Sequence, residues 1–250
     1  ELHGEIYSLM NRHENVAYTP REQARLKGQL EHNLESLWRT GEIHVTRPTI
    51  DAELQNALHY LREVFPEALT RAHIHLREAW VAAGYDPAGV DGVATPVRFG
   101  TWIGGDRDGH PFVTSDVTER SLKALRSNAL RIHRRALEKM AYATPLSSLF
   151  QVPPPQLVAL NVRLRAELDK EPTVDVGYIV ERNKEEPWRE AAFLMRAKVL
   201  LAMEKPMSPV CYRSAKELDA DLVVYGAALE AVGAGHLPKE HVVPLRRLAA

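Results

Sequence analysis

Apolar residues recur every three or four positions through most of the chain, which is the spacing of amphipathic helices. Within a helical pattern from residue 2 to about residue 40, this spacing is clearest at Leu26, Leu30, Leu34 and Leu37. The same periodicity predicts helices over residues 52–84, with a bend or break near Pro66, and over residues 114–140, 157–168, 187–204 and 214–233, with a short one near the end. The chain is therefore expected to be mainly α-helical.

One segment has the pattern of a β-strand. In "TPVRFGTWI", residues 95–103, β-branched and aromatic residues alternate with Arg98, Gly100 and Trp102. A single strand needs a partner for its backbone N–H and C=O groups. The strand is therefore expected to pair locally or with a part of the protein that this chain does not contain.

Composition and charge narrow the class of protein. The 250 residues are 45% hydrophobic and 26% charged, with a formal net charge of -1, whereas nucleic-acid-binding domains usually have a basic excess. No apolar run approaches the roughly 18 residues that cross a bilayer. The single cysteine, Cys211, excludes an internal disulfide and fits a reducing, cytoplasmic location. The first residue, Glu1, lies within a helical pattern and is not methionine, so we expect an excised fragment.

The chemistry concentrates in one loop, "GGDRDG", residues 104–109. Its glycines, Gly104, Gly105 and Gly109, allow backbone shapes closed to other residues, and Asp106, Arg107 and Asp108 add charge. A strand, a glycine-rich turn and a helix N-terminus together suggest an anion site. A structural turn in which the aspartates cap amides and hold Arg107 explains the same composition equally well.

Familiar binding motifs do not fit this chain. The residues after Gly109 are His110 and Pro111 rather than the Lys-Ser/Thr of a phosphate-binding loop, and a calcium-loop frame lacks its strongest ligands. His73 and His75 are two residues apart and point to different faces of a helix, so no metal ligands are assigned. Cys211 has no base near it in the sequence and is not expected to be a nucleophile.

The stretch "RFGTWIGGDRDGHPFVT" strongly resembles the "SWMGGDRDGNP-VT" segment of the phosphoenolpyruvate carboxylase family. Three other stretches resemble family segments in the same order: "LWRTGEIHVTRPTIDAEL", "ALHYLREVFPEAL" and "EPWREAAFLMRAKV". The resemblance covers nearly the whole chain and implies an internal, helical fragment of an α/β-barrel enzyme with about one barrel strand near residues 96–103. The family's "TAHPT", "YSDSAKD" and "GRGG" segments are not in this sequence.

The resemblance also implies a reaction, in which phosphoenolpyruvate and bicarbonate give oxaloacetate and phosphate with Mg²⁺ or Mn²⁺. The active-site loop would comprise Trp102, Gly104, Gly105, Asp106, Arg107, Asp108 and Gly109, with Trp102 lining an apolar carbon dioxide pocket. No catalytic set is complete here, because the family's histidine, lysine and metal ligands are missing. The isolated fragment is therefore expected to be inactive and metal-free, whereas the full-length enzyme is expected to be a cytoplasmic homotetramer.

The expected organisation is a single helical fragment over residues 1–250, with N-terminal helices at 1–94, a strand and loop at 95–114 and a helical bundle at 115–250. Three departures from the family pattern are His110, where most members have asparagine, Ile103, where many have methionine, and "EIHV" in place of an arginine-rich segment. The last of these puts sugar-phosphate activation in doubt. The alternative function is a helical scaffold or regulatory module that retains the loop as a structural turn. No nucleic-acid or membrane partner is expected.

Overall fold

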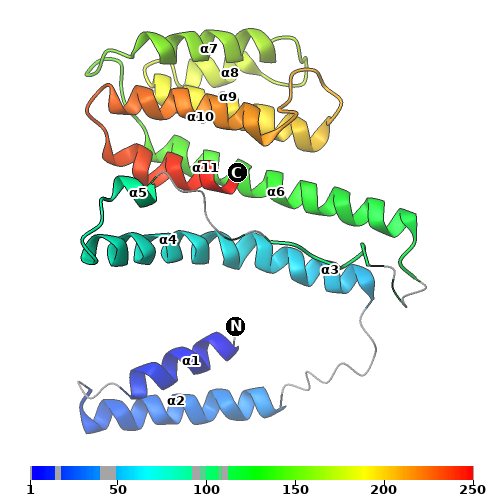
Figure 1. Cartoon of the computed structure of the whole chain (residues 1–250), viewed down its shortest axis with the longest axis vertical. Helices are drawn as coiled ribbons and strands as arrows, with labels where there is room; N and C mark the ends of the chain where they lie inside the picture. Colours follow the sequence, from blue (N-terminus) through cyan, green and yellow to red (C-terminus); the bar gives the residue numbers. More distant parts are fainter. Residues whose placement is uncertain are drawn as a thin grey trace. The chain divides into compact units, whose positions relative to one another are not determined.

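The computed structural model describes residues 2–14, 18–39, 49–91, 97, 99–106, 108 and 112–249. The chain divides into two compact units, residues 1–49 and residues 50–250 (Figure 1). All regular structure in the described residues is helical, which confirms the mainly α-helical expectation.

The first unit is a pair of helices, α1 (Leu2–His13) and α2 (Pro20–Arg39), that pack on each other through Ile6, Leu9 and Leu26. The sequence pattern predicted one continuous helical stretch here, and the helix break is a correction. Its cause is a capping box: the Thr19 backbone N–H and hydroxyl both donate to the Glu22 carboxylate, at 2.8 and 2.7 Å. Pro20 follows as the first helical residue, where its missing N–H costs nothing.

The second unit contains the remaining helices. A long, interrupted element runs through α3 (Ile50–His59), the π-helical turn η1 (Tyr60–Val64) and α4 (Phe65–Ala82), and the short α5 (Ala88–Asp91) follows. The interruption lies just before Pro66, close to the predicted bend. The other helices are α6 (Ser115–Ala143), α7 (Pro155–Leu168), α8 (Val176–Arg182), α9 (Pro187–Glu204), α10 (Ala215–Glu230), the π-helical turn η2 (Pro238–Val242) and α11 (Val243–Ala249).

The strand predicted for residues 95–103 is absent from the described residues of that segment. Residues 97 and 99–102 have no regular structure and residue 103 lies in a turn, while residues 95, 96 and 98 are outside the described part of the chain. The physical reason is the absence of a partner: an isolated strand leaves its backbone groups unpaired, and no second strand occurs among the residues described.

Helix α9 is the centre of the second unit. It packs against α6 on one side and against α7, α8 and α10 on others, and eleven of its residues are buried (Figure 1). Trp188, Leu194 and Met195 are completely inaccessible to solvent. A helix that is apolar on nearly all sides belongs in the interior of a bundle. The sequence placed this helix at residues 187–204, and its bounds are confirmed.

Two charged residues are nevertheless buried on α9, and both pair with α7. The Glu190 carboxylate, 2% exposed, accepts two hydrogen bonds from the Arg165 guanidinium at 2.6 Å each. Lys198 donates from Nζ to Glu167 Oε2 at 2.6 Å and lies 4.4 Å from the centre of the Tyr212 ring. These contacts fix the register of α7 along α9, because a shift of one turn would leave a charge buried without a partner.

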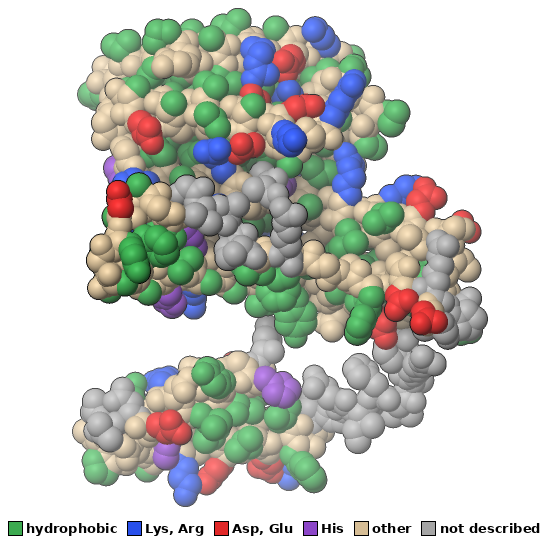
Figure 2. Space-filling view, viewed as in Figure 1, with side chains coloured by type: hydrophobic (Ala, Val, Ile, Leu, Met, Phe, Trp, Pro, Cys, Tyr) green, Lys and Arg blue, Asp and Glu red, His purple; other side chains and the backbone are tan. Residues whose placement is uncertain are grey.

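The visible face of the second unit carries Lys and Arg side chains interspersed with Asp and Glu (Figure 2). Some exposed charged residues pair within a single helix, as Lys123 does with Glu119 at 2.6 Å. Such exposed pairs contribute little to stability. None of the described helices combines the length and the apolar character needed to cross a membrane.

The Arg165–Glu190 pair yields an asymmetric stability prediction. Arg165→Met leaves the Glu190 carboxylate buried without a partner, and this is expected to lower the free energy of unfolding by about 3–5 kcal/mol. Glu190→Gln is expected to cost less, because the Arg165 side chain is 38% exposed and can turn to water. Guanidinium denaturation followed by circular dichroism measures both values. Equal losses for the two variants would contradict the buried-charge explanation.

Helix α6 contains a buried histidine, and one of its two ring nitrogens has no hydrogen-bond partner. His133 is 9% exposed, and its Nδ1 atom lacks a hydrogen-bond partner. Burial disfavours the charged imidazolium and lowers the pKa of His133. In the unfolded chain the imidazole has an ordinary pKa of about 6.5. The unfolded state therefore binds a proton more readily than the folded state.

This difference predicts that stability falls on acidification. The contribution of neutral His133 to the free energy of unfolding is fully present above the pKa of about 6.5 that the imidazole has in the unfolded chain. It is lost as the pH falls toward the lower pKa of the folded state, by at most about 1.4 kcal/mol per pH unit. The free energy of unfolding of His133→Gln is expected to depend less steeply on pH between about 7.5 and 5.5 than that of the wild type. His236→Gln, at an exposed position, is the control and should keep the wild-type slope.

Candidate functional site

The glycine-rich loop between α5 and α6 forms a tight turn around the carbonyl of Trp102. The backbone N–H groups of Gly105 and Asp106 both donate to this oxygen, at 2.9 Å each. The backbone N–H of Ile103 donates to Thr101 Oγ1 at 3.1 Å. The turn is thus held by its own hydrogen bonds, and these same groups are not free to bind an anion.

Gly104 fixes the loop against helix α6. Its φ is +77°, in the left-handed region that favours glycine, and the residue is buried. A Cβ atom at this position would lie 2.0 Å from Ser121 Oγ and 2.7 Å from Ser121 Cβ. The backbone at Gly104 therefore lies close to α6, and its neighbour there is the Ser121 side chain.

A second contact holds the start of the loop to helix α4. The Phe99 ring stacks on the Phe65 ring with 4.3 Å between centroids and 6° between planes. Both residues keep part of their surface exposed. The loop is consequently attached at Phe99 to α4 and at Gly104 to α6, and its geometry depends on both helices.

A hollow of about 220 Å³ lies beside this turn. Among the predicted site residues, Trp102, Gly104, Asp106 and Asp108 line it, and the Trp102 side chain is 77% exposed. Gly105 is not part of the lining. The other lining residues were missed by the sequence reasoning: Ile50, Glu53, Ile103 and Val113. Ile50 and Glu53 belong to the first turn of α3, about fifty positions from the loop, so no local motif connects them with it.

The electrostatic character of the described lining is acidic. Asp106 Oδ1 accepts a hydrogen bond from the backbone N–H of Asp108 at 3.0 Å, so one of the two aspartates stabilises the turn, as the structural interpretation expected. Glu53 is the third carboxylate and is exposed. Arg107, Gly109, His110 and Pro111 lie outside the described residues, and the predicted ion pairs of Arg107 with the aspartates lie there too.

Helix α6 begins directly after the loop. Its cap is Thr114, whose Oγ1 accepts a hydrogen bond from the backbone N–H of Val117 at 3.4 Å. Arg120, in the second turn, lies 3.9 Å from the Asp51 carboxylate of α3. Both side chains are more than half exposed, so this ion pair adds little stability.

Among the described residues, no three His, Cys, Asp or Glu side chains are grouped so that they could hold a metal ion. The described residues therefore do not form a site for a divalent cation. What the hollow offers is a rigid turn, an exposed indole and an apolar rim from Ile50, Ile103 and Val113.

Known proteins resemble this chain over its whole length. The sequence model of the phosphoenolpyruvate carboxylase family matches residues 1–250. Phosphoenolpyruvate carboxylase of Methylorubrum extorquens is 29% identical over 247 residues, which is 97% of this chain and 26% of that protein. The enzymes of the same name from Rhodopseudomonas palustris strain HaA2 and Gloeobacter violaceus are each 29% identical and cover 98% and 96% of the chain.

The chain spans about a quarter of the length of these relatives, 26% in each of the three. The match extends through both compact units, and it includes the turn at Trp102 together with the helices that hold it. With the family's sequence pattern present from the first residue to the last, this chain belongs to the phosphoenolpyruvate carboxylase family.

Proposed function

We propose that this chain forms part of an enzyme that converts phosphoenolpyruvate and bicarbonate to oxaloacetate and phosphate. The observation that carries the proposal is the family match over residues 1–250, which includes the loop "TWIGGDRDG". The enzyme is proposed to be a carboxy-lyase whose product, oxaloacetate, replenishes the tricarboxylic acid cycle. It is also proposed to be cytoplasmic and to assemble as a homotetramer. Only about a quarter of the relatives' length is represented here, so the catalytic groups are proposed to come from other segments.

The proposed role of the loop is to exclude water from the reaction. Carboxylation of phosphoenolpyruvate passes through carboxyphosphate and an enolate, and water must be kept from the enolate until carbon dioxide adds. The exposed indole of Trp102, with Ile50 and Val113 beside it, supplies apolar surface for such a wall. Gly104 sets the position of that wall by its contact with Ser121.

A divalent cation, Mg²⁺ or Mn²⁺, is suggested for the complete enzyme by the family. It would stabilise the negative charge of the phosphoryl group and of the enolate. Asp106, Asp108 and Glu53 are not assigned to this ion, because the described residues do not gather a set of ligands. The proposed role of this chain is to position the loop and to shield the enolate from water.

One observation favours the second candidate function, a helical scaffold or regulatory module. The hydrogen bonds to the Trp102 carbonyl and the contact of Gly104 with Ser121 account for the turn without any ligand. In that case the Trp102 side chain would have no part in catalysis. Substitution of this residue therefore separates the two functions.

The test uses a chimera in which residues 1–250 replace the corresponding segment of the Methylorubrum extorquens enzyme. Trp102→Ala in this chimera is expected to lower the kcat of oxaloacetate formation at least about tenfold, because the apolar wall is lost. A coupled assay with malate dehydrogenase, Mg²⁺, phosphoenolpyruvate and bicarbonate measures the rate. The 250-residue chain alone serves as the blank and is expected to form no oxaloacetate.

The matched control is Trp38→Ala, which removes an indole that is 89% exposed on α2, outside the loop. It should leave the kcat unchanged. Unchanged activity of the Trp102→Ala chimera would favour the scaffold, and a chimera without any activity would contradict the proposal that this chain can serve in the enzyme.

A second prediction concerns the loop's attachment. Gly104→Ala is expected to lower the free energy of unfolding of the chain by about 1–3 kcal/mol, because alanine is disfavoured at a positive φ and its Cβ would overlap Ser121. Gly105→Ala is the control: its φ lies outside the left-handed region, and the nearest atom to its Cβ would be 3.7 Å away. Chemical denaturation compares the variants, and equal losses would show that the contact with α6 is unimportant.

A further inference from the structure

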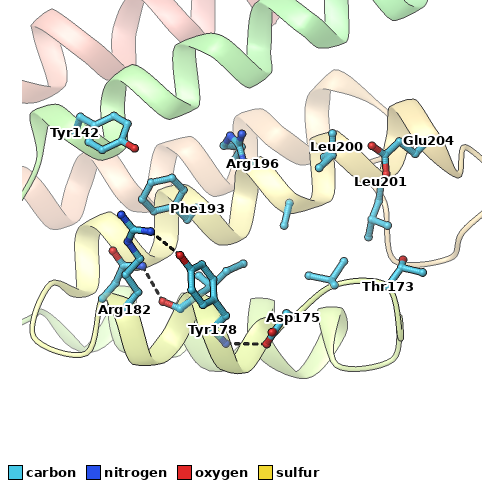
Figure 3. Close-up of a pocket in the computed structure, with 14 residues that line it drawn as sticks. Tyr142, Thr173, Asp175, Tyr178, Arg182, Phe193, Arg196, Leu200, Leu201 and Glu204 are labelled. Carbon is cyan, nitrogen blue, oxygen red and sulfur yellow. Dashed lines mark hydrogen bonds between the residues drawn. The ribbon is translucent and has the colours of Figure 1, made fainter.

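The second unit has a cavity far from the loop in sequence, enclosed by α8, α9, the end of α6 and residues 173–175 (Figure 3). Its volume is about 340 Å³, within the range of small-molecule sites. Nothing in the carboxylation chemistry proposed above uses this cavity.

The floor of the cavity is an apolar stripe on α9. Phe193, Ala197, Leu200 and Leu201 lie at spacings of four, three and one residues, so they share one face of the helix. Ile179 of α8 faces them across the cavity. This surface has no hydrogen-bonding groups of its own and would favour the apolar part of a ligand.

One end of the cavity is basic and aromatic. The Arg182 guanidinium donates to the Tyr178 hydroxyl at 2.5 Å, and the Phe193 ring lies edge-on to Tyr142 with 5.9 Å between centroids (Figure 3). Among the described residues, no carboxylate lies within ion-pair distance of Arg182. Four of the five N–H donors of this guanidinium are therefore available to a ligand.

Arg196 adds a second guanidinium to the lining. Its Nε atom is buried and has no hydrogen-bond partner. Its contact with Glu138 is long, 3.5 Å between Nη2 and Oε1. Arg196 is already paired with a carboxylate, whereas Arg182 has no carboxylate partner among the described residues. Arg182 is therefore the cationic group that is available to an anion in the cavity.

The acidic groups of the cavity limit the charge of a ligand. Glu204 lies at the end opposite Arg182 (Figure 3). Asp175 is engaged as the cap of α8, where its Oδ1 accepts a hydrogen bond from the backbone N–H of Tyr178 at 2.8 Å. A second anionic group on a ligand would be repelled by Glu204, and a cationic head would be repelled by Arg182.

We infer that this cavity is a binding site for a monocarboxylate with an apolar body. The planar guanidinium of Arg182 matches the two oxygens of a carboxylate, and the Tyr178 hydroxyl is next to it. The body of the ligand lies along Phe193, Ala197 and Leu200. Sugar phosphates and dicarboxylates do not match the apolar floor or the acidic far end.

The experiment titrates the 250-residue chain with 3-phenylpropionate at pH 7.5, by isothermal calorimetry and by saturation-transfer NMR. The expected Kd is on the order of 1 mM. The neutral 3-phenylpropionamide and the dicarboxylate succinate are each expected to bind at least about tenfold more weakly, because the first lacks the charge and the second lacks the apolar body. Equal binding of the amide, or no binding of 3-phenylpropionate, would overturn the inference.

Variants of the chain test the location of the site. Arg182→Gln is expected to weaken 3-phenylpropionate binding at least about tenfold, since it removes the charge-assisted hydrogen bonds. Ala197→Leu should also weaken binding, because its side chain fills the floor. Arg213→Gln, at an exposed arginine outside the cavity, is the matched control and should bind as the wild type does.

Circular dichroism checks that each variant is folded. Arg182 is exposed, so its substitution leaves the core intact and decides the question even if Ala197→Leu does not fold. Wild-type affinity in Arg182→Gln, or an equal loss in Arg213→Gln, would show that the carboxylate does not bind at this guanidinium.

Discussion

The burial of helix α9 is the constraint on which the second unit depends. Because α9 is covered on nearly all sides, its charged residues Glu190 and Lys198 must find partners inside the protein, and α7 supplies both. The opposite side of α9 holds α6, where Arg126 donates to the Ala202 carbonyl at 2.9 Å. The position of α6 in turn sets the position of the glycine-rich loop at its N-terminus.

The positions of the hollow at Trp102 and of the cavity at Arg182 both depend on how α6 packs against α9. The hollow at Trp102 lies at the N-terminal end of α6, where Gly104 contacts Ser121. The cavity at Arg182 lies at the other end of α6, where Tyr142 reaches toward Phe193 of α9. The 29 residues of α6 form a rigid element between them. At 1.5 Å per residue, an α-helix of this length spans roughly 40 Å.

The sequence predicted most of the helices because their apolar residues follow the helical period. The sequence pattern did not predict the short helix α8, which depends on a cap and on tertiary contacts rather than on a helical period. Helix α8 was missed because Val176, Gly177 and Ile179 are poor helix formers, and the helix depends on the Asp175 cap and on packing against α9. The loop was found from its composition and its family resemblance. Ile50 and Glu53 were not, because they are about fifty positions from the loop and reach the hollow only through tertiary packing.

The π-helical turn η1 ends directly before Phe65, the residue of α4 that stacks on Phe99 at the start of the loop. A π-helical turn closes its hydrogen bonds over five residues rather than four, so it accommodates an additional residue without ending the helical element. Any change in chain length between residues 60 and 64 therefore acts directly beside one of the two attachments of the loop.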